Sequence, residues 1–282
     1  MGFKKFSNLI MIEQTLFALP FAYIGILFAD SPKNKSISIW IFATIALISA
    51  RTAGMSFNRV IDANIDAKNP RTKDRTIPKG EATKTEVWLI GILSSLVLIL
   101  SSYLLNSLCF YLSFAAVFLL FTYSYFKRFS SSSHFYLGLV EAAAPIGGYL
   151  AVTGKFSLVP FILGSAILLW IAGLDIVYAL LDKDFDRKEN LHSLPSSYGE
   201  NKALKISTVC YILSIGSMIA AGLITGKSIP YWIAIACITF VFTYQQIIAR
   251  SKDLEPALNK FFKINMYVSP FLLIGTFIDV IF

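Results

Sequence analysis

The chain has 282 residues, of which 56% are hydrophobic and only 15% are charged, and its mean hydropathy is +0.65. Soluble globular chains carry about 25% charged residues. This composition therefore excludes an ordinary water-soluble enzyme and an intrinsically disordered protein, and it indicates an integral membrane protein. The three cysteines lie inside apolar runs without ligand-like spacing, which excludes a disulfide framework.

Apolar segments recur along the whole chain, and most approach the roughly 20 residues that a membrane-spanning helix needs. In chain order they are 14–29, 37–57, 87–105, 108–126, 135–152, 158–181, 206–223, 229–248 and 261–282. The strands of a membrane barrel would be about 10 residues long and alternating in polarity, so helices are the spanning structure that fits. We therefore expect an all-α membrane protein with nine transmembrane helices, organised as a single domain over residues 1–282.

The basic residues predict how these helices are oriented. If the N-terminus is cytoplasmic, all but four of the 25 Lys and Arg fall on the cytoplasmic side; the four exceptions are Lys33, Lys35, Lys155 and Lys227. This asymmetry satisfies the positive-inside rule and predicts a C-terminus on the opposite side, with the bacterial inner or cell membrane as the expected location. Because orientation accounts for the net charge of +8, we do not expect nucleic acid as a partner.

Acidic residues gather at two cytoplasmic helix ends, in spacings that place each set on one helical face. The set after the second segment is Asn58, Asp62 and Asp66. The set after the sixth segment is Asp175, Tyr178, Asp182 and Asp186. One interpretation is that these are solvated charges at membrane exits. However, a carboxylate in the last turn of a helix opposes the helix dipole at a cost of about 0.3–1 kcal/mol, and Asp175 lies inside an apolar run, where an ionisable group indicates function.

Because both helices exit at the same leaflet, the two sets could meet in one site, where a cation would be needed to compensate their charge. Oxygen ligands in paired clusters suit Mg²⁺, which typically binds through one or two carboxylates and the phosphates of a substrate. The candidate metal ligands are Asp62, Asp66, Asp182 and Asp186. The candidate substrate-binding residues beside them, which could hold a polyphosphate, are Asn58, Lys68, Arg71, Arg75, Lys127 and Arg128. Acids for a metal, bases for phosphate and a lipid bilayer beside both predict a lipid diphosphate as substrate.

These motifs resemble the two signatures of the UbiA superfamily of intramembrane prenyltransferases: Asn-x-x-x-Asp-x-x-x-Asp at 58–66 and Asp-x-x-Tyr-x-x-x-Asp-x-x-x-Asp at 175–186. The run Arg-Thr-Ala-Gly at 51–54 and the loop Arg-Thr-Ile-Pro-Lys-Gly at 75–80 are similar to the 4-hydroxybenzoate polyprenyltransferase branch. The segment Leu-His-Ser-Leu-Pro at 191–195 is more similar to the subgroup that prenylates 1,4-dihydroxy-6-naphthoate on the futalosine route to menaquinone.

The resemblance implies a UbiA-type bundle with Mg²⁺ as cofactor. It implies transfer of a polyprenyl group from polyprenyl diphosphate to the ring of a hydroxylated aromatic acid of the 4-hydroxybenzoate type in ubiquinone biosynthesis, at the cytoplasmic face of the bilayer. The alternative acceptor is 1,4-dihydroxy-6-naphthoate in menaquinone biosynthesis. A remote alternative of another class is an ion-coupled membrane transporter, but such transporters place their sites near the midplane, whereas here the acids gather at one leaflet.

Arg51 is the candidate for binding the aromatic acid. It lies seven positions before Asn58, hence on the same helical face and about 10.5 Å deeper in the bilayer at 1.5 Å per residue. A guanidinium fork at that depth suits a carboxylate. The alternative is a structural arginine paired with Glu13 or Glu141.

Asp175 is the candidate for polarising or deprotonating the hydroxyl of the acceptor, with Tyr178 as its hydrogen-bonding neighbour. The alternative is that Asp175 binds the metal and has no acid–base role. His134 and His192 lie near membrane exits without a ligand partner at helical spacing, and we expect both to be structural.

Overall fold

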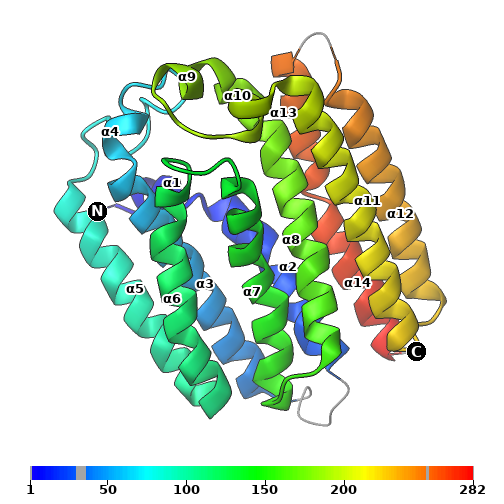
Figure 1. Ribbon diagram of the computed structural model, residues 1–282. Coiled ribbons are helices and arrows are strands. Elements are labelled where there is room, and N and C mark those ends of the chain that lie inside the picture. Colours follow the sequence, from blue (N-terminus) through cyan, green and yellow to red (C-terminus); the bar gives the residue numbers. More distant parts are fainter. Residues whose placement is uncertain (1, 30–35, 252–253, 282) are drawn as a thin grey trace.

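The computed structural model describes residues 2–29, 36–251 and 254–281, and every regular element within these ranges is a helix (Figure 1). Eight helical stretches in the described residues are long and apolar enough to cross a membrane, and a shorter apolar helix, Ile12–Phe28, accompanies them. The expected all-α bundle of nine apolar segments is thereby confirmed.

The helices succeed one another with mostly short connections (Figure 1). They are α1 Phe3–Ile10, α2 Ile12–Phe28, α3 Ile37–Ile61, α4 Ala63–Asp66, α5 Lys84–Leu105, α6 Ser107–Phe126, α7 Ser133–Thr153, α8 Leu158–Tyr178, the 3₁₀ turn η2 Ala179–Asp182, α9 Lys183–Lys188, α10 Leu194–Tyr198, α11 Glu200–Ile224, α12 Ile229–Ile248, α13 Leu254–Asn265 and α14 Val268–Ile281. The predicted span 229–248 coincides with α12, and most other predicted ends lie within a few residues of the observed ones.

The start of α5 shows why some ends differ. The helix begins at Lys84, three residues before the predicted apolar run, because a capping box nucleates it. The Thr83 hydroxyl accepts a hydrogen bond from the Glu86 backbone N–H at 3.2 Å, and the Glu86 carboxylate accepts one from the Thr83 N–H at 2.8 Å. The first turn of α5 is polar, so a prediction from hydropathy places the start of the helix too late.

The ninth predicted segment is interrupted. Pro256–Ile281 as a whole is long and apolar enough to cross a membrane, but it forms two helices, α13 and α14, so the expected single helix is corrected to two consecutive ones. Pro270 in the first turn of α14 has no N–H with which to bond the Met266 carbonyl and continue α13. The Asn265 amide oxygen also accepts a hydrogen bond from Trp170 Nε1 at 3.0 Å, which fixes the end of α13. Phe282, the last residue of the predicted segment, lies outside the described residues.

Glycines allow α2 and α7 to pack closely. A Cβ on Gly25 would lie 2.1 Å from the Pro145 carbonyl oxygen, and one on Gly148 would lie 2.0 Å from the Ala22 carbonyl oxygen. Small residues at such crossings let helix backbones approach within a membrane. Any larger side chain at either glycine would separate α2 from α7.

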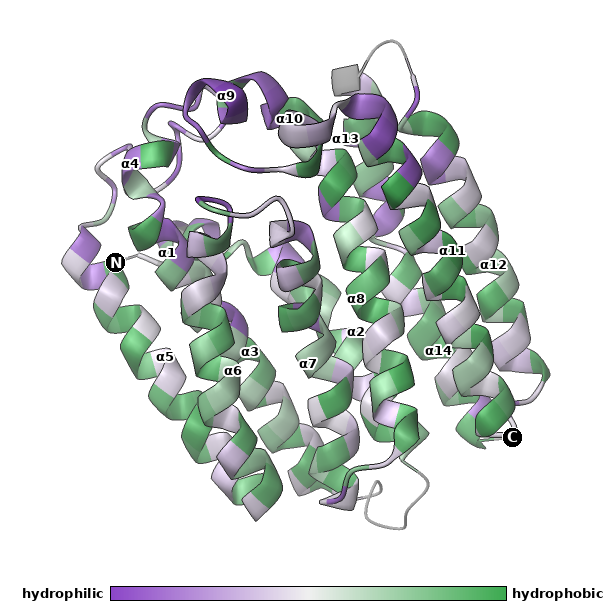
Figure 2. Cartoon of the chain, in the orientation of Figure 1, coloured by the Kyte–Doolittle hydropathy of each residue, from purple (hydrophilic) through white to green (hydrophobic). Residues whose placement is uncertain are grey.

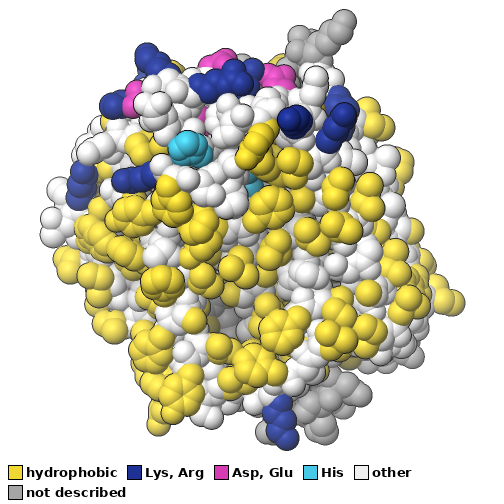
Figure 3. All heavy atoms as spheres, viewed as in Figure 1, with side chains coloured by type: hydrophobic (Ala, Val, Ile, Leu, Met, Phe, Trp, Pro, Cys, Tyr) yellow, Lys and Arg dark blue, Asp and Glu magenta, His cyan; other side chains and the backbone are white. Residues whose placement is uncertain are grey.

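Polar residues gather at one end of the bundle. Figure 2 shows hydrophilic residues concentrated on α4, α9 and α10, and Figure 3 shows most of the charged side chains over that end and mainly hydrophobic side chains over the middle of this face. Two of the four basic residues expected on the opposite side, Lys155 and Lys227, follow the far ends of α7 and α11. The other two, Lys33 and Lys35, lie outside the described residues. The ends of α3 and α8, with both acidic sets, face the polar end.

Candidate functional site

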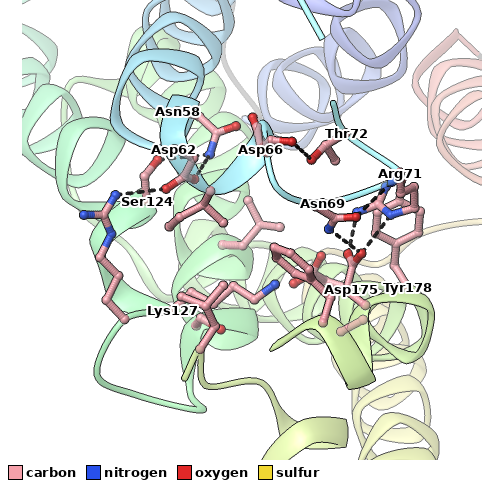
Figure 4. A pocket seen from close by; sticks show the side chains of 18 of the residues that line it. Asn58, Asp62, Asp66, Asn69, Arg71, Thr72, Ser124, Lys127, Asp175 and Tyr178 are labelled. Atoms are coloured by element: carbon pink, nitrogen blue, oxygen red, sulfur yellow. Dashed lines mark hydrogen bonds and ion pairs between the residues drawn. The ribbon is translucent and has the colours of Figure 1, made fainter. Parts of the chain in front are cut away.

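A cavity of about 170 Å³ lies at the polar end and is lined by members of both acidic sets. Figure 4 shows Asn58, Asp62 and Asp66 on one side of it and Asp175 and Tyr178 on the other. Residues separated by more than 100 positions in the sequence are therefore brought to one site.

The first set keeps its helical spacing across the junction of α3 and α4. The Asp62 N–H donates to the Asn58 carbonyl at 2.9 Å, and the Asp66 N–H donates to the Asp62 carbonyl at 2.8 Å. The Asn58 amide donates to Asp62 Oδ2 at 2.8 Å and to Ser124 Oγ at 3.1 Å. Arg75 Nη1 donates to both carboxylate oxygens of Asp66, at 2.7 and 2.9 Å. These bonds hold the first set against α6 and the loop that follows α4.

The second set centres on Asp182, which ends the 3₁₀ turn after α8. The Asp182 carboxylate accepts hydrogen bonds from Asn69 Nδ2 at 2.9 Å and from Arg71 Nε at 3.0 Å, and Arg71 Nη2 bonds its second oxygen. Arg71 also bonds the Tyr178 hydroxyl. The loop after α4 therefore supplies the partners of the carboxylate that follows α8.

Asp186 does not join the cavity. The helix is interrupted at Asp182 itself, whose backbone (φ −101°, ψ 1°) departs from helical values before α9 begins, so the face shared by Asp175, Tyr178 and Asp182 is not continued to Asp186. The Asp186 side chain is 0% exposed, lies 2.8 Å from Lys127 Nζ and is absent from the cavity lining. The expectation that all four residues share one face is corrected to three, and a metal-binding role for Asp186 stays a prediction.

Each of the four predicted metal ligands is paired with a predicted phosphate-binding residue. The pairs are Asp62–Arg128, Asp66–Arg75, Asp182–Arg71 and Asp186–Lys127. All four basic partners line the cavity. Lys68 does not: its side chain is 62% exposed, and its ammonium bonds Glu189 at 2.6 Å. The cavity is thus surrounded by alternating negative and positive groups.

Arg51 is absent from the cavity lining. Its guanidinium pairs with Glu141 of α7 and donates to Gln14 Oε1 at 3.3 Å. Pairing with Glu141 is one of the two structural alternatives for this residue. A role for Arg51 toward the aromatic acid stays a prediction.

Several cavity residues escaped prediction, namely Asn69, Thr72, Tyr123, Ser124 and His134. Tyr123 lies four residues before Lys127 on α6, so helical spacing offered a signal for it. His134 gave none, since its partner is 41 residues away: His134 Nδ1 lies 2.7 Å from Asp175 Oδ2. The expectation that His134 is structural stays a prediction, but the structure gives it a partner, Asp175, that helical spacing could not indicate.

The donor chemistry of the cavity fits Mg²⁺, because its anionic and amide ligands are all oxygens. Within the described residues, no group of three or more His, Cys, Asp or Glu side chains is arranged to hold a metal. Carboxylates alone therefore form no complete cage, which agrees with the usual Mg²⁺ mode of one or two carboxylates plus substrate phosphates. When bound, the ion would act as a Lewis acid toward a phosphate leaving group, and the carboxylates of Asp62, Asp66 and Asp182, which line the cavity, are the candidates to bind it together with that phosphate.

The pKa of Asp62 predicts how metal binding depends on pH. Burial raises this pKa to about 6, although a hydrogen bond from Arg128 lowers it. Below about pH 6 the carboxyl is protonated, so proton and metal compete for it. We expect the half-saturating Mg²⁺ concentration for binding of a prenyl diphosphate to be flat between about pH 7 and 8, and to rise by about tenfold per unit below pH 6. Titrations across this range test it, and a midpoint unchanged at about pH 5 would contradict it.

A bundle of apolar helices with a cavity of carboxylates and basic side chains at one end defines a multi-pass membrane protein with a charged site at its polar end. The UbiA prenyltransferase family matches residues 18–267, and the chain belongs to this family. It is accordingly an integral membrane prenyltransferase.

Individual relatives cover nearly the whole chain. The chain is 30% identical to the apo structure of a UbiA homolog from Aeropyrum pernix K1, with a TM-score of 0.87 over 95% of this chain and 98% of that one. It is 27% identical over 258 residues to a 4-hydroxybenzoate octaprenyltransferase of Paraburkholderia phymatum, covering 92% of this chain and 87% of the relative. A UbiA homolog from Archaeoglobus fulgidus bound to DMAPP and Mg²⁺ shares the fold, with 18% identity and a TM-score of 0.72 over 98% of this chain and 99% of that one.

Proposed function

We propose that the chain transfers a polyprenyl group, with Mg²⁺, from polyprenyl diphosphate to the ring of a hydroxylated aromatic acid of the 4-hydroxybenzoate type, at the cytoplasmic face of the bilayer. The observation that carries this proposal is a single cavity, at the polar end of an apolar bundle, lined by carboxylates of both motifs and by basic side chains. The 4-hydroxybenzoate octaprenyltransferases among its relatives support the class of acceptor.

The paired charges of the cavity supply the binding chemistry. A divalent ion would take the place of the basic partners of Asp62, Asp66 and Asp182. Arg71 and Arg75 would then be free to bind diphosphate oxygens, for which the guanidinium fork is well shaped. In this exchange each carboxylate would gain the metal as its partner and each released guanidinium would gain a diphosphate oxygen, so no buried charge would be left unpaired.

Prenyl transfer breaks the bond from the prenyl C1 to the diphosphate oxygen, whose electron pair leaves with the diphosphate. A ring carbon of the acceptor then supplies the pair for the new bond and afterwards loses its proton. Arg71 and Arg75 would stabilise charge as it develops on the leaving group. Asp175, which lines the same cavity, is the carboxylate available to hydrogen-bond the hydroxyl of the acceptor and increase the electron density of its ring.

Apolar side chains complete the cavity wall: Ile65, Leu137, Phe185 and Leu191. They limit the water that can reach an allylic cation and quench it. The same wall suits an isoprenoid tail entering from the bilayer.

Prenylation of 1,4-dihydroxy-6-naphthoate is the second candidate, because the segment 191–195 resembles that subgroup and its first residue, Leu191, lines the cavity. The transporter alternative is not retained, since the chain belongs to a prenyltransferase family.

One assay separates these candidates. Purified protein is incubated with Mg²⁺ and farnesyl diphosphate together with either 4-hydroxybenzoate or 1,4-dihydroxy-6-naphthoate, and the product is identified by mass, with a parallel sample in EDTA. Prenylated 4-hydroxybenzoate that forms only with Mg²⁺ supports the proposal. Product from the naphthoate alone would select the second acceptor, and absence of product from both would reject prenylation of these acids.

The role of Arg51 can be tested by measuring which of the two KM values changes when it is replaced. If Arg51 binds the carboxylate of the acceptor, Arg51→Ala should raise the acceptor KM about tenfold or more and change the KM of the prenyl diphosphate by less than about twofold. Glu141→Gln, the matched control, should leave the acceptor KM unchanged or lower it, because it removes the carboxylate that competes for Arg51. Equal increases of both KM values in Arg51→Ala would assign the residue to packing.

A further inference from the structure

His134 joins two parts of the site that are far apart in sequence. It lies in the first turn of α7, is only 2% exposed and yet belongs to the cavity wall. One ring nitrogen, Nδ1, is 2.7 Å from Asp175 Oδ2 on α8. The other, Nε2, accepts a hydrogen bond from the Leu194 backbone N–H at 3.1 Å, at the start of α10.

These two contacts define the protonation of the ring. A backbone N–H can only donate, so Nε2 must present its lone pair to Leu194. The single hydrogen of the neutral imidazole is then on Nδ1, where it donates to the Asp175 carboxylate. A proton on Nε2 would place two N–H groups against each other, so the two contacts favour the tautomer that donates from Nδ1 to Asp175.

The hydrogen bond to His134 leaves part of the Asp175 side chain exposed to the cavity. Its side chain is 28% exposed and lines the cavity. His134 is almost completely enclosed, so the carboxylate, and not the imidazole, is the group presented to a substrate. The hydrogen bond to Oδ2 fixes how the carboxylate is turned.

The second contact of His134 ties this orientation to the connection between α9 and α10. The His192 N–H donates to the Lys127 carbonyl at 2.7 Å, and the Leu194 N–H donates to His134, so the connection is attached to the ends of both α6 and α7. Leu191 in the same connection lines the cavity. His134 therefore contacts both the connection that completes the cavity wall and the carboxylate of Asp175.

We propose that His134 is a positioning residue, which orients Asp175 toward the hydroxyl of the aromatic acceptor by donating a hydrogen bond from Nδ1. This inference rests on the proposed function, because it assigns Asp175 to the acceptor. It gives a role to a histidine that the sequence pattern alone assigned to structure.

A pair of substitutions separates the two contacts. Asn at 134 keeps a donor close to the position of Nδ1 but is too short to reach Leu194. Gln at 134 reaches Leu194 with an acceptor but has no polar group near the position of Nδ1. We expect His134→Asn to keep kcat within about threefold of the wild type and His134→Gln to lower it by about 10- to 100-fold, as for other residues that orient a reacting group. In both variants the KM of the prenyl diphosphate should stay within about twofold.

The opposite order, with His134→Gln active and His134→Asn impaired, would assign His134 to the connection between α9 and α10 and overturn the proposal. Equal loss in both variants, with a matching fall in Tm, would assign it to folding and overturn the proposal as well. Full activity in both would have the same consequence.

A spectroscopic measurement tests the geometry independently of turnover. The chain has only two histidines, and the His192 side chain is exposed, so a His192→Gln variant labelled with ¹⁵N-histidine reports on His134 alone. We expect protonated Nδ1 and unprotonated Nε2, with the signals shifted in the additional variant Asp175→Asn. A ring protonated on Nε2 would overturn the inference. Failure of the wild type to prenylate either acid would instead reject the proposed function, so the two failures are distinguishable.

Discussion

Asp182→Asn is expected to lower kcat/KM for prenyl transfer by about 10²–10³-fold, the effect of losing one preorganised electrostatic group in an active site. Asn69 and Arg71 converge on this carboxylate, and the substitution keeps its size while it removes the charge that a metal would require. The measurement is the initial rate at saturating acceptor, with Mg²⁺ varied.

Asp184→Asn is the matched control. It removes the same charge two residues further along the chain, and the Asp184 side chain is 88% exposed. We expect it to behave as the wild type. Comparable rates for Asp182→Asn and Asp184→Asn, with both proteins folded, would contradict a metal-binding role for Asp182.

Arg71→Ala is expected to lower kcat/KM by about 10²-fold or more, since an interaction with developing charge on the leaving group is lost. Arg71 contacts both oxygens of Asp182 and the Tyr178 hydroxyl, and its guanidinium carbon lies 4.6 Å from the centre of the Tyr178 ring. Arg71→Lys keeps the charge but not the fork, so it should recover only part of the activity.

Lys73→Ala provides the control for charge alone, because Lys73 is exposed on the same loop. It should change kcat/KM by less than about twofold. If Arg71→Ala lowered Tm but left kcat/KM unchanged, Arg71 would be a structural partner of Asp182 only.

The sequence predicted the helices well because membrane spans depend on local composition. Runs of apolar residues are required along nearly the whole length of each span, so hydropathy places α12 at its observed residues. Helix ends and breaks that depend on a single contact differ from the prediction. The break between α13 and α14 involves Pro270 and a buried hydrogen bond from Trp170, which lies 95 residues from its acceptor.

The site was predictable where it follows helical periodicity. Spacing four apart placed Asn58, Asp62 and Asp66 on one face, and that face lines the cavity. Spacing failed at Asp186, because the backbone leaves the helical conformation at Asp182 and a new helix, α9, begins after it.

Contacts between distant elements were beyond any local pattern. The fold of the loop after α4 brings Arg71 to Asp182, 111 residues away. The packing of α7 on α8 brings His134 to Asp175, 41 residues away. Each of these contacts depends on how the helices pack together, and the spacing of residues within one helix carries no information about that packing.

The most direct measurement is a structure of the protein with Mn²⁺ in place of Mg²⁺ and an unreactive prenyl thiodiphosphate, with the metal located by its anomalous scattering. We predict metal bound by carboxylates of both motifs, including Asp62 and Asp182, with Arg71 and Arg75 on the diphosphate oxygens. A diphosphate outside this cavity, or metal bound to neither carboxylate, would contradict the account.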